Sequence, residues 1–129
     1  MPPINRSPDD SPDRNIFDRT ALLQSIHGDH ELLTQFIELF LKDFPDKMAA
    51  LHAATPAADG TEPGDRAALR NAAHKILGSA RTMRLNRLAD AALDLQRLVD
   101  TEPHHLEQLA AGSARVTAEY ERVVAILRR

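Results

Sequence analysis

Residues 65–99 read DRAALRNAAHKILGSARTMRLNRLADAALDLQRLV, and their pattern of apolar residues indicates the fold class. The apolar side chains recur every three or four residues, which places them on one face of an α-helix. The first such face consists of Leu69, Ala72, Ile76, Ala80 and Met83. The second consists of Leu85, Leu88, Ala92, Leu95 and Val99. The stretch therefore predicts two amphipathic helices in succession, the first over residues 65–83.

The same periodicity continues on both sides of this pair. A short helix is predicted over residues 18–26, with Asp18 as its N-cap and Gly28 as its stop. Asp29 caps a long helix, whose apolar stripe is Leu33, Phe36, Ile37, Phe40, Phe44, Met48 and Leu51. The last helix carries Leu106, Leu109, Val116, Tyr120, Val123, Val124 and Leu127.

Prolines and glycines mark the joints between these helices. Pro45 lies inside the long stripe and lacks a backbone donor, so we expect a kink there. Residues 53–64 (AATPAADGTEPG) are typical of a loop, and Thr101 and Pro103 mark the start of the last helix. Residues 1–14 hold four of the eight prolines and are predicted to be a flexible tail. We therefore predict an all-α protein, an antiparallel four-helix bundle with a short extra N-terminal helix, over residues 15–129.

The bulk composition excludes several classes of protein. A chain of 129 residues has room for one domain, and its lack of cysteine removes disulfides and thiolate chemistry. No apolar run approaches the ~20 residues of a membrane helix, and the N-terminus has no apolar core for a secretion signal. A net charge of -3 and 4% aromatic residues argue against nucleic-acid binding. We expect a soluble, cytoplasmic protein.

His74 lies opposite the apolar face of its predicted helix. At about 100° per residue, the core residues fall roughly 160–240° away from it, so its imidazole is expected to face solvent. Arg70, Leu77, Gly78 and Arg81 fall on the same outer arc. An imidazole nitrogen is a nucleophile toward an activated phosphoryl group, and nearby arginines can meet the charge of the product.

Gly78 follows His74 by four residues and is therefore stacked next to it on the helix. Glycine inside a helix costs about 1 kcal/mol relative to alanine and needs a reason. Here it leaves room for a phosphoryl group or another backbone to approach the ring. The alternative is a close helix–helix contact through Gly78.

A basic segment surrounds the histidine in the sequence. No Asp or Glu occurs between residues 66 and 87, and the basic residues are Arg66, Arg70, Lys75, Arg81, Arg84 and Arg87. In an acidic protein, such a segment indicates a partner with an acidic surface. A solvated helix face is the alternative interpretation.

The segment AHKILGSARTMRLNRLADAALDL, residues 73–95, resembles the signature of histidine phosphotransfer (HPt) domains. The match is carried by His74, Ile76, Gly78, Ser79, Ala80 and Met83. Residues 17–51 are similar to the family's first two helices, so the resemblance covers residues 16–129. There are two departures. The family's lysine three positions after the histidine is Leu77 here, and Arg84 stands where the family usually has a glycine.

The resemblance implies a phosphocarrier and not an enzyme. His74 would take a phosphoryl group from the aspartate of one receiver domain and pass it to another, in response regulators or hybrid sensor kinases. The chain would need no cofactor of its own, since the receiver supplies Mg²⁺, and we expect a monomer. Leu77 would be an apolar docking contact beside the histidine.

Because the family's lysine is missing, another basic residue must supply the positive charge beside His74. Lys75 lies about 100° around the helix from His74 and is poorly placed to take its role. Arg81 and Arg70 each lie within about 40° of the histidine direction and are the expected replacements.

Three alternatives are weighed against a phosphorelay. A degenerate bundle would bind a receiver without carrying phosphate, and Leu77 in the lysine position favours it. A metal site is disfavoured because none of the six histidines lies in the Glu-x-x-His pattern of bundle metal sites. A self-sufficient kinase would need a glycine-rich nucleotide loop and an ATP-binding domain, and neither is present in the sequence.

Overall fold

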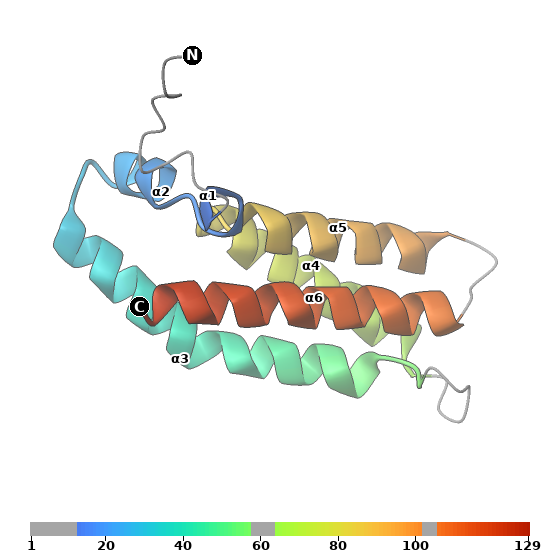
Figure 1. Cartoon of the computed structure of the whole chain (residues 1–129). Helices are drawn as coiled ribbons and strands as arrows, with labels where there is room; N and C mark the ends of the chain where they lie inside the picture. The colour runs from blue at the N-terminus through green and yellow to red at the C-terminus, as the bar shows by residue number, and fades with distance from the viewer. Residues whose placement is uncertain (1–12, 58–63, 102–105) are drawn as a thin grey trace, which may run out of the picture.

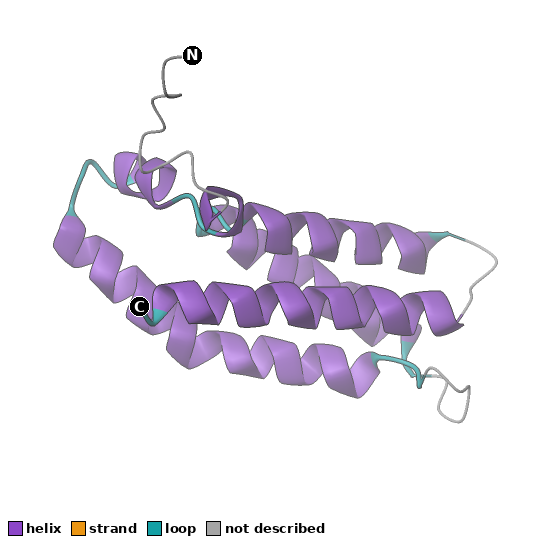
Figure 2. Ribbon diagram, in the orientation of Figure 1, coloured by secondary structure: helices purple, strands orange, loops and turns teal. Residues whose placement is uncertain are grey.

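The computed structural model describes residues 13–57, 64–101 and 106–129. In these ranges the chain forms α1 (Asp13–Ile16), α2 (Arg19–Ser25), α3 (His30–Ala54), α4 (Arg66–Thr82), α5 (Asn86–Asp100) and α6 (Leu106–Leu127). The four long helices α3–α6 run side by side, and α1 and α2 lie at one end of them (Figure 1). Figure 2 shows helices and loops without a strand in the part of the chain that is described. The predicted all-α bundle is confirmed.

Aspartate caps fix where three helices begin. The carboxylates of Asp18, Asp29 and Asp65 accept hydrogen bonds from the backbone N–H groups of Ala21, Leu32 and Ala68, at 3.0, 3.0 and 3.1 Å. Each bond satisfies an N–H that has no partner within the helix, and such a cap is worth about 1 kcal/mol. The starts predicted from Asp18, Asp29 and Asp65 are therefore confirmed.

Pro45 lies inside α3, as its position in the apolar stripe predicted. Its ring is exposed, so it does not disturb the core. Because proline has no N–H, it cannot bond the carbonyl of Leu41, and its ring crowds that group. Figure 1 shows α3 changing direction part-way along its length, as expected from the missing hydrogen bond and the crowding by the proline ring.

The core is built from the apolar faces of all four long helices. α4 packs between α3 and α5, α5 packs between α4 and α6, and the direct contact of α3 with α6 is less extensive. The predicted core residues of α4 and α5 are all buried. Glu119 of α6 was not predicted there, yet only 5% of it is exposed. Its Oε1 accepts from the Arg87 and Arg122 guanidiniums at 2.8 and 2.9 Å, which compensates much of the cost of burying a carboxylate.

The turn from α4 into α5 keeps a glycine-like shape without a glycine. Arg84 has φ +60°, in the left-handed region that glycine favours. The Leu85 N–H donates to the Ala80 carbonyl at 2.8 Å and the Arg84 N–H to the Arg81 carbonyl at 3.2 Å. These two bonds form a Schellman motif. The Arg84 carbonyl also accepts from the Asp18 N–H at 3.0 Å, so the turn anchors the segment that leads into α2.

Three details differ from the sequence-based expectations. The short helix α1 was not predicted, and Asp13 and Arg14, which we assigned to the tail, belong to it. At the end of α2 the left-handed conformation begins at His27 (φ +59°), one residue before the expected Gly28 (φ +74°). Pro103, which we took to mark the start of α6, lies outside the described residues, as do residues 1–12 of the predicted tail.

The strain at Arg84 gives a stability prediction. Arg84→Gly removes the cost of a left-handed conformation for a residue with a side chain, which we expect to raise the free energy of unfolding by about 1 kcal/mol. Urea denaturation would measure it. Arg97→Gly, at an exposed position inside α5, is the matched control and should lower stability by about 1 kcal/mol. A loss of stability in Arg84→Gly would contradict the observed turn.

Candidate functional site

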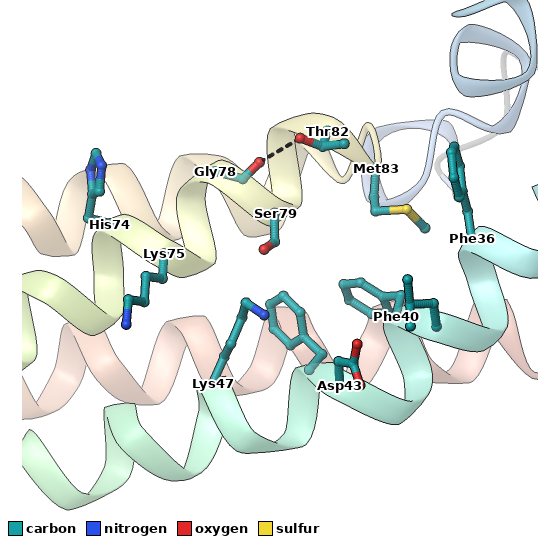
Figure 3. A pocket seen from close by; sticks show the side chains of 12 residues that line it. Phe36, Phe40, Asp43, Lys47, His74, Lys75, Gly78, Ser79, Thr82 and Met83 are labelled. Atoms are coloured by element: carbon teal, nitrogen blue, oxygen red, sulfur yellow. Dashed lines mark hydrogen bonds between the residues drawn. The ribbon is translucent and has the colours of Figure 1, made fainter. Parts of the chain in front are cut away.

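His74 stands on the outer face of α4 at a firmly held backbone position. The histidine is exposed, whereas its neighbours Ala73 and Ile76 are fully buried. Figure 3 shows the imidazole projecting from α4 away from α3. Burial of the opposite face fixes the helix rotation, so the ring is presented to solvent as the sequence predicted.

A groove of about 570 Å³ runs between α3 and α4 beside this histidine. Figure 3 shows the two helices facing each other across it. The α3 side is lined by Phe36, Leu39, Phe40, Asp43, Phe44 and Lys47. The α4 side is lined by His74, Lys75, Gly78, Ser79, Thr82 and Met83.

The two ends of this groove differ in chemistry. Phe36 and Met83 lie at one end, whereas Lys47 and Lys75 lie at the end near His74 (Figure 3). Leu39 belongs to the α3 wall and is 55% exposed, the most exposed large apolar side chain in the described part of the chain. Aromatic and methionine side chains such as those that line this groove are enriched at the cores of protein interfaces, so the groove is the candidate docking site.

Stacked aromatic rings support the groove from below. The Phe40 and Phe44 ring centroids are 4.3 Å apart, and Phe44 stacks on Tyr120 of α6 at 5.1 Å. Burial raises the pKa of the Tyr120 hydroxyl, against a lowering by Arg128. The contact of Phe44 with Tyr120 ties the α3 side of the groove to α6.

Gly78 leaves open space beside His74. A Cβ built at this position would have no heavy atom within 4 Å outside its own helix turn and neighbours. The alternative that Gly78 permits a close contact between helices is therefore wrong, since no second helix approaches it. The free space that the sequence predicted at Gly78, one helical turn after His74, is present.

The prediction that Leu77 is an exposed docking contact is wrong. Leu77 is only 4% exposed, so it is not a docking contact beside His74. The helical wheel assumed one buried face, but α4 is packed by α3 on one side and α5 on the other. The buried arc is therefore wide enough to include Leu77. The exposed apolar contact is Leu39, which the sequence analysis missed although it falls outside the α3 stripe and so had no place in the core.

The basic segment divides into two groups. Three of its arginines are directed toward α5 and α6, where they contact the Val99 carbonyl (Arg66, 3.1 Å), Asp100 (Arg70, 2.7 Å) and Glu119 (Arg87, 2.8 Å). The hydrogen bond and charge of Asp100 raise the pKa of Arg70 above its ordinary value. Arg70 is thus paired with α5, which makes it a poorer candidate to contact a phosphoryl group on His74.

The remaining basic residues of the segment are exposed. Among the described residues, no acidic side chain lies within ion-pair distance of Lys75, Arg81 or Arg84. Lys75 projects toward α3 and into the groove, away from the imidazole direction (Figure 3). Arg81 is exposed two turns along α4 from His74. Of the two predicted helpers, Arg81 is the one with an uncommitted guanidinium in the described structure.

The other histidines do not form a metal site where they are described. No three His, Cys, Asp or Glu side chains in the described ranges are placed to hold a metal ion. The His52 ring shares a hydrogen bond with the Thr117 hydroxyl at 2.9 Å, and His104 and His105 lie outside the described residues. In the same ranges, none of the helices has the length and hydrophobicity to cross a bilayer.

A family model for the Hpt domain matches residues 35–126, which is more than half of the chain. The chain belongs to the Hpt domain family. The match runs from within α3 to within α6 and includes His74 and the whole groove, whereas α1 and α2 lie outside it. Hpt domains are phosphocarriers of two-component phosphorelays and interact with receiver domains. No curated protein and no solved structure matches the chain.

A side chain at Gly78 should have opposite effects on stability and on phosphoryl transfer. Gly78→Ala meets no neighbouring atom, so we expect it to raise the free energy of unfolding by about 1 kcal/mol through helix propensity. The added methyl group narrows the approach to the imidazole, and we expect phosphoryl transfer to slow by about tenfold or more. Urea denaturation and a transfer time course would measure the two effects.

Gly112→Ala in α6 is the matched control for this substitution. Its Cβ would meet Leu95 Cδ1 at 3.0 Å and Leu98 Cδ1 at 3.3 Å, so we expect a smaller gain or a loss of stability. Transfer should be unchanged, since Gly112 does not line the groove. Equal transfer rates for wild type and Gly78→Ala would show that the open space has no function.

Proposed function

We propose that His74 accepts a phosphoryl group from the aspartate of a receiver domain and passes it to the aspartate of another. The observation that carries this proposal is the exposed His74 at the edge of an open groove, with free space at Gly78. Membership of the Hpt family supports the direction of the chemistry. The chain would act as a cytoplasmic monomer that forms a complex with one receiver at a time.

The transfer needs one nucleophile from this chain. A nitrogen of the His74 imidazole attacks the phosphorus of the aspartyl phosphate, an N–P bond forms, and the carboxylate leaves with the electrons of the O–P bond. The second receiver's aspartate reverses these changes. The receiver would supply Mg²⁺ and its acidic pocket, so this chain contributes position, access and charge.

Docking would use the groove beside the histidine. The apolar end at Phe36 and Met83, together with the exposed Leu39 of the α3 wall, provides a surface that a receiver can cover, and the polar end lies next to the reacting atoms. Protein interfaces commonly have an apolar centre and a charged rim. This division lets the partner bind through one end while the phosphoryl group passes at the other.

A degenerate bundle that binds a receiver without carrying phosphate is the second candidate. Its support is Leu77, which is buried and supplies no charge where the family has a lysine. The open space at Gly78 favours the active relay, since a binding-only bundle does not need a glycine beside a solvent-facing histidine. The two candidates differ in whether His74 becomes phosphorylated.

Substitution of the histidine tests the proposed function directly. After incubation with a phosphorylated receiver domain, the wild-type chain should carry an acid-labile, base-stable phosphate, and His74→Gln should carry none. His74→Gln should keep the wild-type circular dichroism and unfolding midpoint, because the side chain is exposed. His30→Gln, at another exposed position, is the matched control and should be phosphorylated normally. Receiver binding without phosphate on the wild-type chain would leave only the degenerate candidate.

The helper of His74 is tested by the lifetime of the phosphorylated form. We expect Arg81→Ala to shorten the phosphohistidine half-life by about threefold or more, since a charge-assisted contact that stabilises the phosphoryl oxygens is lost. Arg70→Ala should have little effect, because Asp100 already holds that side chain. Lys75→Ala should also have less effect than Arg81→Ala. Equal half-lives in the three variants would refute the assignment to Arg81.

A further inference from the structure

The α3 wall of the groove carries two opposite charges that do not pair with each other. Asp43 and Lys47 are one turn apart, with the acid on the N-terminal side, the arrangement in which helical ion pairs form most readily. No ion pair joins them in the described structure. The Lys47 ammonium instead lies 5.9 Å from the centroid of the Phe44 ring, within the range of a cation–π contact.

The polar residues of this groove are arranged in order along its length. Lys75 of α4 and Lys47 of α3 lie toward the end near His74, and Asp43 lies between them and the apolar end (Figure 3). Asp43 is exposed and is the sole carboxylate among the residues that line the groove. A partner that fills the apolar end must therefore cover this carboxylate or lie directly beside it.

Covering an unpaired charge has a free-energy cost unless the partner supplies the opposite charge. A partner with a basic side chain at this point pairs with Asp43, whereas one with an acidic side chain there is repelled. Such a difference between partners is the physical basis of specificity. The lysines at the other end favour any acidic phosphorylation pocket and so discriminate less among receivers.

We propose that Asp43 is a specificity-determining residue, which selects receiver domains whose docking surface places a basic side chain next to its apolar centre. The inference rests on the proposed function, since it concerns the same groove. Asp43 does not touch the reacting atoms. It acts on the encounter with the receiver and leaves the chemical step at His74 unchanged.

The test compares transfer rates from a set of phosphorylated receiver domains to the wild-type chain, Asp43→Lys and Glu38→Lys. Glu38 is exposed on α3, does not line the groove and lies about 140° around the helix from Asp43, so it matches the change in net charge. For the receivers that serve wild type best, we expect Asp43→Lys to raise the half-saturating receiver concentration by roughly tenfold or more. The rate at saturation should change by less than about twofold, and Glu38→Lys should leave both values near wild type.

A charge reversal on the receiver completes the test. Among single Lys→Glu and Arg→Glu replacements on the best receiver, at least one should restore transfer to Asp43→Lys and impair transfer to wild type. Equal effects of Asp43→Lys and Glu38→Lys on every receiver, or no reversal that rescues, would overturn the role of Asp43 and leave phosphorylation of His74 intact. Failure of every receiver to phosphorylate the wild-type chain would instead overturn the proposed function, and this inference with it.

Discussion

The packing of α4 between α3 and α5 is the constraint on which the site depends. With neighbours on both sides, α4 has a buried arc wide enough to include Leu77, and its opposite face, which carries His74, is exposed. Ala73, Ile76 and Leu77 fill the buried arc around His74, so the helix cannot rotate to hide the histidine without exposing apolar side chains. Each of the larger side chains would lose roughly 1.5–3 kcal/mol of burial energy. The exposed imidazole is therefore a consequence of the core.

Much of the fold could be predicted from the sequence, because the signals are local. The spacing of apolar residues identified the four long helices and the faces of α4 and α5. The caps Asp18 and Asp29 predicted two helix starts, the apolar spacing placed a third start near Asp65, and Pro45 predicted the bend of α3. The left-handed Arg84 was not predictable from residue preference. The surrounding hydrogen bonds hold this turn in a shape for which arginine itself has little preference.

The candidate site was predicted in part, and its errors have a common physical cause. The exposure of His74 and Gly78 on one face of α4 was predicted correctly from that helix alone. Leu77 was misassigned, Leu39 was missed and Arg70 proved to be paired with Asp100, because each depends on which helices are neighbours. A helical wheel contains no such information. The groove is formed by α3 and α4 together, so the sequence pattern of either helix alone does not predict it.

Amide chemical-shift mapping tests whether a receiver domain docks, as proposed, on the α3–α4 groove beside His74. An isolated receiver domain would be added to the ¹⁵N-labelled chain, with the shifts followed residue by residue. We expect perturbations to concentrate on residues 36–47 of α3 and on residues 74–83, in α4 and at its C-cap. Perturbations confined to the outer surfaces of α5 and α6, with the groove unaffected by a bound receiver, would contradict it.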